Sequence, residues 1–97
     1  MFLFVKRSDL ITDYIDLSVY GSIHVEQVGP TMIAITLKHR NYQSDAHLQV
    51  QSEYDSRCLL VILFKYLGQR GPSEMYSLED MIAAGKKLFE QTDREGL

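Results

Sequence analysis

Residues 14–27 have the sequence YIDLSVYGSIHVEQ, in which apolar and polar side chains alternate. A period of two residues is typical of a strand with one buried face. A two-residue hairpin at Gly21-Ser22 would place Val19 opposite His24 and so mix apolar and polar residues on one face. The pattern therefore predicts one long strand that continues through Gly21 as a bend or bulge. Its inward-facing residues would be Ile15, Leu17, Val19, Ile23 and Val25.

Two further strands follow in the same alternating pattern. Gly29-Pro30 turns the chain, because proline fixes its own φ and has no N–H to donate. Alternation resumes over residues 32–39 and, after a polar loop at 40–45, again over residues 47–51. The three alternating segments together predict a β-meander.

The apolar positions also predict how these strands pair. Pairing Ile35 with Val50 would place Leu37 opposite Leu48 and keep all four side chains on one face, as an antiparallel sheet requires. Residues 2–6 are expected to add a short first strand.

Residues 58–67 are apolar on both faces, so their periodicity does not separate a central strand from a buried helix. Ser56 as an N-cap and Gly68 just past the end favour a helix. The β-branched pair Val61-Ile62 and the preceding meander favour a strand. We favour the strand and keep the helix as the alternative.

A C-terminal amphipathic helix is predicted at residues 78–91. Ser77 is a suitable N-cap, and Glu79 and Asp80 place negative charge in the first turn, where it suits the helix dipole. Gly85 lies on the apolar stripe, which suggests a close approach to the sheet. That stripe consists of Leu78, Met81, Ile82, Gly85, Leu88 and Phe89.

The expected architecture is thus α+β: an antiparallel β-meander of four to five strands, with the C-terminal amphipathic helix packed on one face. The 97 residues suit a single domain spanning 1–97, and 10 basic against 13 acidic residues give a net charge of −3. Cys58 is the only cysteine, which excludes an intrachain disulfide and favours a cytoplasmic location. We expect no signal peptide, no membrane span and no cofactor.

Catalytic and metal-binding residue types are present but scattered. His24 and His47 are expected on strands either side of residues 32–39, about 10 Å apart, which is too far for two ligands of one zinc ion. Cys58 opens an apolar run, where a cysteine normally behaves as a small buried hydrophobe. A small enzyme using His24, His47 or Cys58 is therefore only the second alternative.

Recognition of another protein is the favoured function. Tyrosine is enriched at interfaces, and this chain has 6 tyrosines. Small acidic domains of this kind include inhibitors, adaptors and the antagonists that phages and mobile elements direct against host systems, an analogy of size and composition only. An exposed sheet edge would also allow a homodimer. The expected partner-binding residues are Tyr20, His24, Thr36, Lys38, Arg40, Tyr42, Gln49 and Gln51.

The first alternative is a nucleic-acid-binding regulator that uses the cluster Lys38-His39-Arg40. The overall negative charge and the small number of cations on the expected exposed face argue against it. Nucleic acid is therefore not the expected partner.

Overall fold

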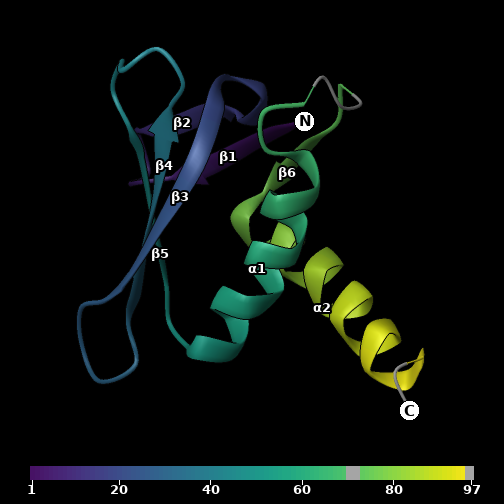
Figure 1. Ribbon diagram of the computed structural model, residues 1–97. Coiled ribbons are helices and arrows are strands. Elements are labelled where there is room, and N and C mark those ends of the chain that lie inside the picture. Colours follow the sequence, from purple (N-terminus) through teal and green to yellow (C-terminus); the bar gives the residue numbers. More distant parts are fainter. Residues whose placement is uncertain (70–72, 96–97) are drawn as a thin grey trace.

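The computed structural model describes residues 1–69 and 73–95. It has a mixed α+β fold of two three-stranded sheets and two α-helices (Figure 1). Sheet A has the strand order β2-β1-β6, and sheet B has the order β3-β4-β5. The elements are β1 (Phe2–Lys6), β2 (Thr12–Asp16), the 3-10 turn η1 (Leu17–Val19), β3 (Tyr20–Gln27), β4 (Ile33–His39), β5 (Ala46–Val50), α1 (Glu53–Tyr66), β6 (Met75–Ser77) and α2 (Leu78–Glu95).

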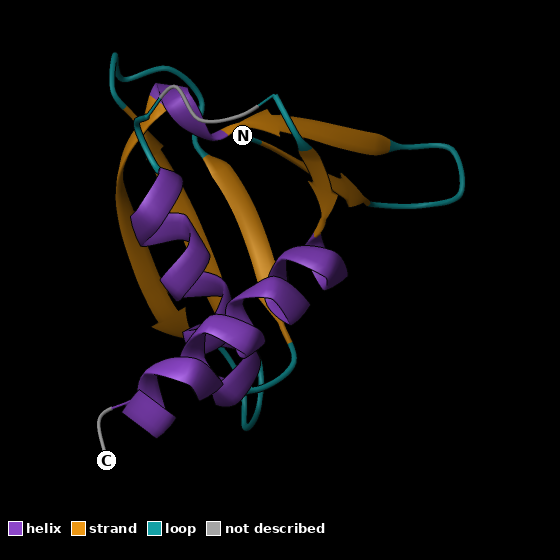
Figure 2. Ribbon diagram, turned by 90° about the vertical axis from the view of Figure 1, so that its right-hand side faces the viewer, coloured by secondary structure: helices purple, strands orange, loops and turns teal. Residues whose placement is uncertain are grey.

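The expected α+β class is confirmed, with an antiparallel meander in sheet B and a packed C-terminal helix. The strands are divided between two sheets, because β1 pairs antiparallel with β2 and parallel with β6. The two helices lie on one side of the strands (Figure 2). The core between these layers comprises Leu3, Ile15, Leu17, Ile35, Leu37, Leu48, Leu59, Leu63 and Met81, with smaller contributions around them.

The long strand predicted over residues 14–27 is wrong, because η1 interrupts it. The Asp16 carboxylate accepts hydrogen bonds from the Ser18 backbone N–H at 3.0 Å and from the Ser18 hydroxyl at 2.7 Å. Such local side-chain bonds compete with a strand ladder and stabilise a turn. β2 and β3 therefore belong to different sheets. The bulge predicted at Gly21 is confirmed by a register shift between Tyr20 and Ser22.

The register predicted between the second and third meander strands is wrong by two residues. Ile35 pairs with Leu48 and Leu37 pairs with Ala46. A register shift by an even number of residues leaves every side chain on its expected face. The alternation of apolar and polar residues therefore does not distinguish the two registers. Asp45 helps to set the observed register, because its carboxylate accepts the His39 backbone N–H across the turn at 3.3 Å.

The strand favoured at residues 58–67 is also wrong, since this segment belongs to α1. The helix begins earlier than the apolar run, and its N-cap is Ser52, whose hydroxyl accepts the Asp55 N–H at 3.0 Å. Ser56, the N-cap of the helical alternative, is buried inside the helix. Gly68 follows the C-cap residue Leu67 with a φ of 73°, a left-handed conformation that glycine adopts readily.

The C-terminal helix is confirmed, and the Ser77 hydroxyl accepts the Asp80 N–H at 3.1 Å. Met81 is its most buried apolar side chain, whereas Phe89 is half-buried with its ring edge-on to Tyr54. The close approach predicted at Gly85 is present, but it is made to α1 and not to the sheet. A Cβ added at Gly85 would collide with the carbonyl oxygen of Cys58.

Candidate partner-binding surface

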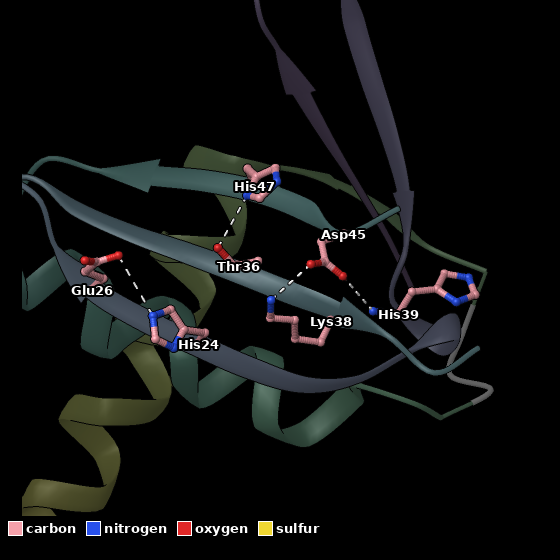
Figure 3. A network of polar contacts seen from close by, with 7 residues as sticks. All are labelled: His24, Glu26, Thr36, Lys38, His39, Asp45 and His47. Carbon is pink, nitrogen blue, oxygen red and sulfur yellow. Dashed lines mark hydrogen bonds and ion pairs between the residues drawn. The ribbon is translucent and has the colours of Figure 1, made fainter. Parts of the chain in front are cut away.

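The outer face of sheet B, turned away from the helices, carries four of the expected binding residues: His24, Thr36, Lys38 and Gln49. His24 on β3 and His47 on β5 both pair with Thr36 on β4, so these three residues form one row across the sheet (Figure 3). We call this surface the polar face; it comprises Ser22, His24, Glu26, Ala34, Thr36, Lys38, Asp45, His47 and Gln49.

Lys38 and Asp45, two charged residues of the polar face, are paired with each other. The Lys38 ammonium donates to the Asp45 carboxylate at 3.1 Å, and His24 Nε2 lies 3.9 Å from a Glu26 oxygen. The Lys38 hydrogen bond, followed by that from the His39 N–H, lowers the pKa of Asp45. A partner that covered this face would have to desolvate the Lys38–Asp45 pair, which is already satisfied, and this cost offsets part of the gain.

A hollow of 620 Å³ lies at one end of the polar face and is lined by Lys38, Arg40, Tyr42 and Asp45, among others. Tyr42 is 98% exposed and has a φ of 59°. The structure thus brings Lys38, Arg40 and Tyr42 together, as expected of a shared surface. The Arg40 guanidinium also donates to the Gly68 carbonyl, so it ties the loop after β4 to the end of α1.

Two expected binding residues lie elsewhere. Tyr20 is half-buried against the core, with its ring 5.6 Å from that of His39 in an edge-to-face contact. Burial, then the charges of Asp45 and Asp16, raises the pKa of Tyr20. The expectation that Tyr20 shares the exposed face is wrong, because the bulge at Gly21 reverses the alternation. Gln51 is exposed and follows the last residue of β5.

The residues of the basic cluster Lys38-His39-Arg40 all line the hollow beside Tyr42, but each side chain contacts a different part of the protein. Lys38 points to the polar face and pairs with Asp45, while the His39 ring packs against Tyr20. Arg40 reaches Gly68 at the end of α1. With Lys38 paired to Asp45 and Arg40 bound to the Gly68 carbonyl, the cluster does not provide a track of free cations for phosphates.

The residues considered for catalysis lie apart from one another. His24 and His47 are separated by the intervening strand β4. No group of three or more His, Cys, Asp or Glu side chains suited to a metal ion occurs in the part of the chain that the structure describes. Cys58 is buried, as expected of a small core hydrophobe, and burial raises the pKa of its thiol. A raised pKa disfavours the thiolate that a nucleophile needs.

The outer face of sheet A carries an apolar cluster that the sequence analysis did not single out. Phe4 pairs with Tyr14 across β1 and β2, and their ring centroids lie 6.4 Å apart. Phe2 pairs with Met75 across β1 and β6. Tyr14 is 67% exposed and Met75 is 52% exposed, whereas both phenylalanines are half-buried. We call these four residues the aromatic face.

The hairpin that carries the aromatic face is anchored to sheet B. Arg7, between β1 and β2, donates to the Asp13 carboxylate at 2.8 Å and to the His47 carbonyl at 2.6 Å. Leu10 and Ile11 are exposed at the turn of this hairpin, at 97% and 57%. The two bonds of Arg7 attach the β1–β2 hairpin, which carries Phe4 and Tyr14, to sheet B.

One signal in the sequence pointed to this cluster. Phe2 and Phe4 alternate with Leu3 and Val5, so β1 is apolar on both faces, which is typical of a strand covered on both sides. Only the inner face of β1 is covered by helices. β6 lies beside β1 within sheet A and so covers neither face, and both helices pack on the same side of the strands. The exposure of the second face therefore depended on the tertiary arrangement.

Comparison with known proteins adds no functional information. The chain matches no family model, no curated protein and no solved structure. No helix among the described residues is both long and apolar enough to cross a membrane. Functional inference therefore rests on the chemistry of the two outer sheet faces.

Proposed function

We propose that this protein is a non-catalytic protein-binding module, of the inhibitor or adaptor type, whose partner docks on the aromatic face. The observation that carries the proposal is the contact between Phe4 and the exposed Tyr14, with Met75 exposed on the same side of sheet A. Aromatic residues and methionine are enriched at the centres of protein interfaces. Contiguous exposed apolar patches commonly mark interaction sites.

The energetics favour the aromatic face over the polar face. A buried aromatic side chain such as that of Tyr14 contributes about 150 to 250 Å² of contact area. Its hydroxyl still offers a partner a hydrogen bond. A partner on the polar face would instead have to cover the ion pair between Lys38 and Asp45, which is already formed within the protein. Binding there would gain specificity more than affinity.

The setting we propose for this function is the cytoplasm. The single thiol, Cys58, is buried and no disulfide staples the fold, which suits a reducing compartment. The partner we propose is a protein. A nucleic-acid partner would need phosphate contacts from Lys38 and Arg40. Both side chains are already bonded within the chain, Lys38 to Asp45 and Arg40 to the Gly68 carbonyl.

A matched pair of tyrosine variants tests this proposal. The tagged protein is used to isolate its partner from lysate of the source cells, and the affinity of the purified pair is then measured by calorimetry. Tyr14→Ala should weaken binding about tenfold or more, as truncation of an interface hot spot does. Tyr42→Ala removes a tyrosine beside the polar face that is more exposed, at 98% against 67% for Tyr14, and should change the affinity less than about threefold.

The opposite ranking would assign the interface to the hollow beside Tyr42 and overturn our choice of surface. Circular dichroism of both variants checks that the fold is retained. A gel-shift assay with mixed-sequence DNA and RNA tests the nucleic-acid alternative. A shift at physiological salt that the double variant Lys38→Ala, Arg40→Ala abolishes would overturn the protein-binding proposal itself.

A further inference from the structure

β3 forms an open edge of sheet B. No other strand among the described residues pairs with its second side, because the strand order is β3-β4-β5. The opposite edge is partly covered, since the Arg7 guanidinium occupies the His47 carbonyl of β5. Lys and Pro commonly protect exposed edges, yet β3, with the sequence YGSIHVEQ, contains neither.

The hydrogen-bond pattern identifies which backbone groups of β3 face outward. The Val28 N–H donates to the Met32 carbonyl at 3.0 Å, where the turn between β3 and β4 closes. Bonded and non-bonded pairs alternate along an antiparallel ladder, so Glu26 and His24 bond to β4. The N–H and C=O groups of Ile23, Val25 and Gln27 therefore point toward the open edge and are available to another strand.

A hollow lined by both apolar and polar side chains lies beneath this edge, between β3 and α1, and the Glu53–Arg57 ion pair is among the polar ones. Its volume is 360 Å³, and its lining includes Val25, Ile33 and Leu60. Val25 is 44% exposed. Phe64 follows Leu60 by one turn of α1, so it lies on the same side of the helix, and it is 68% exposed. An added strand would cover these apolar side chains as well as pair the backbone.

We propose that the occupant of this edge is a second copy of the chain. The two β3 strands pair antiparallel with Val25 on the two-fold axis, and the two copies of sheet B join into one continuous sheet. An isologous contact of this kind closes on itself and yields a dimer. It leaves the aromatic face on sheet A open, so it does not depend on the function proposed above.

Side-chain complementarity selects the register, because an imidazole N–H can donate to a carboxylate. With Val25 opposite its own copy, His24 of each chain lies opposite Glu26 of the other. These are non-hydrogen-bonded pairs, in which cross-strand side chains approach most closely. Moving the register by two residues places His24 opposite His24 or Glu26 opposite Glu26. Only the Val25-centred register of these three creates two pairs of complementary chemistry.

Cysteine cross-linking tests the axis. Val25→Cys places two thiols on facing residues with Cα atoms about 5.5 Å apart, which is within disulfide range. Gln27→Cys is the matched control, because its two copies would lie about 13 Å apart along the strands. Mild oxidation should give a covalent dimer of Val25→Cys and none of Gln27→Cys on a non-reducing gel. No cross-link at position 25, or equal cross-linking at both positions, would overturn the proposal.

Charge exchange tests the register in solution by sedimentation equilibrium over a range of concentrations. His24→Glu and Glu26→Arg should each weaken the dimer about tenfold, since each creates two poorly matched pairs. The double variant places Glu opposite Arg in both pairs and should return to within about threefold of the original affinity. The side chains are 62% and 66% exposed, so folding should not be affected.

Three results would overturn this second test. The double variant could dimerise as weakly as the single variants, which would rule out the proposed register. The original protein could stay monomeric at every concentration, which would rule out the dimer. The β3 edge of a monomer could pair with an extended segment of a different protein, which would rule out a second copy as the occupant.

Discussion

On the outer face of sheet A, Phe4 and Tyr14 are neighbours across two strands, whereas the corresponding cross-strand neighbours on sheet B include Thr36 and His47. The inner faces of the two sheets do not differ in this way, because both are lined by buried aliphatic side chains. The core requires apolar residues on one face of each sheet and leaves the other face unconstrained. The chemistry of an outer face therefore carries more information about function than that of an inner face.

The largest expected effect tests whether sheets A and B share one core and so differ only in the chemistry of their outer faces. Leu3 in sheet A and Leu37 in sheet B are both fully buried, so replacing either by Ala should cost about 2 to 5 kcal/mol. Urea unfolding should show one cooperative transition for each variant. Lys38→Ala, next to Leu37 but on the outer face, should change stability by less than about 1 kcal/mol. Two separate transitions would show that the sheets do not share a core.

A change in the helix pair should affect both sheets together. Gly85→Ala gains up to about 1 kcal/mol of helix propensity, but its Cβ collides with the backbone of Cys58, and overpacking of this kind costs about 1 to 3 kcal/mol or more. We expect net destabilisation in thermal and urea unfolding. Ala83→Gly, at an exposed position of α2, should cost only the propensity of about 1 kcal/mol. A more stable Gly85→Ala protein would contradict the observed helix contact.

The aromatic face should show a measurable internal coupling that the polar face lacks. A double-mutant cycle on Phe4 and Tyr14 should give about 0.5 to 1.5 kcal/mol, the usual value for an aromatic pair. In Thr36 and His47, the Oγ1 and Nδ1 atoms lie 3.4 Å apart on an exposed surface. The equivalent cycle on these two residues should give a coupling energy of less than about 0.5 kcal/mol. A stronger coupling on the polar face would reverse the comparison.

The smallest effect concerns acid. The hydrogen bond from Lys38, with that from the His39 N–H, lowers the pKa of Asp45 in the folded state, so the folded protein binds fewer protons there than the unfolded chain. The stability from this contact is present above the unfolded pKa of about 3.9 and is lost as pH falls through the folded pKa. Asp45→Asn should flatten that part of the stability curve between about pH 5 and 2. Asp9→Asn, in the β1–β2 turn, is the control.

Local patterns predicted much of the fold. Ser77, with the apolar spacing after it, was sufficient to locate α2, because caps and helical periodicity involve only neighbouring residues. Alternation likewise located β4 and β5, and glycine at position 21 indicated the bulge. The polar face was predicted in part, since His24, Thr36, Lys38 and Gln49 follow from the same alternation. The position of Tyr20 does not follow from this alternation, because the bulge at Gly21 changes the face of the residues before it.

By itself, the sequence determined which residues are apolar, where α2 begins and which sides of β4 and β5 are buried. Only the tertiary structure decided that residues 58–67 are helical, that η1 separates two sheets and that β6 pairs with β1. The reason is that a segment apolar on both faces has no period to distinguish strand from helix. Pairing between distant segments depends on which surfaces remain to be covered. For the same reason, the exposure of Tyr14 beside the half-buried Phe4 became visible only once the helices were placed on the other side of sheet A.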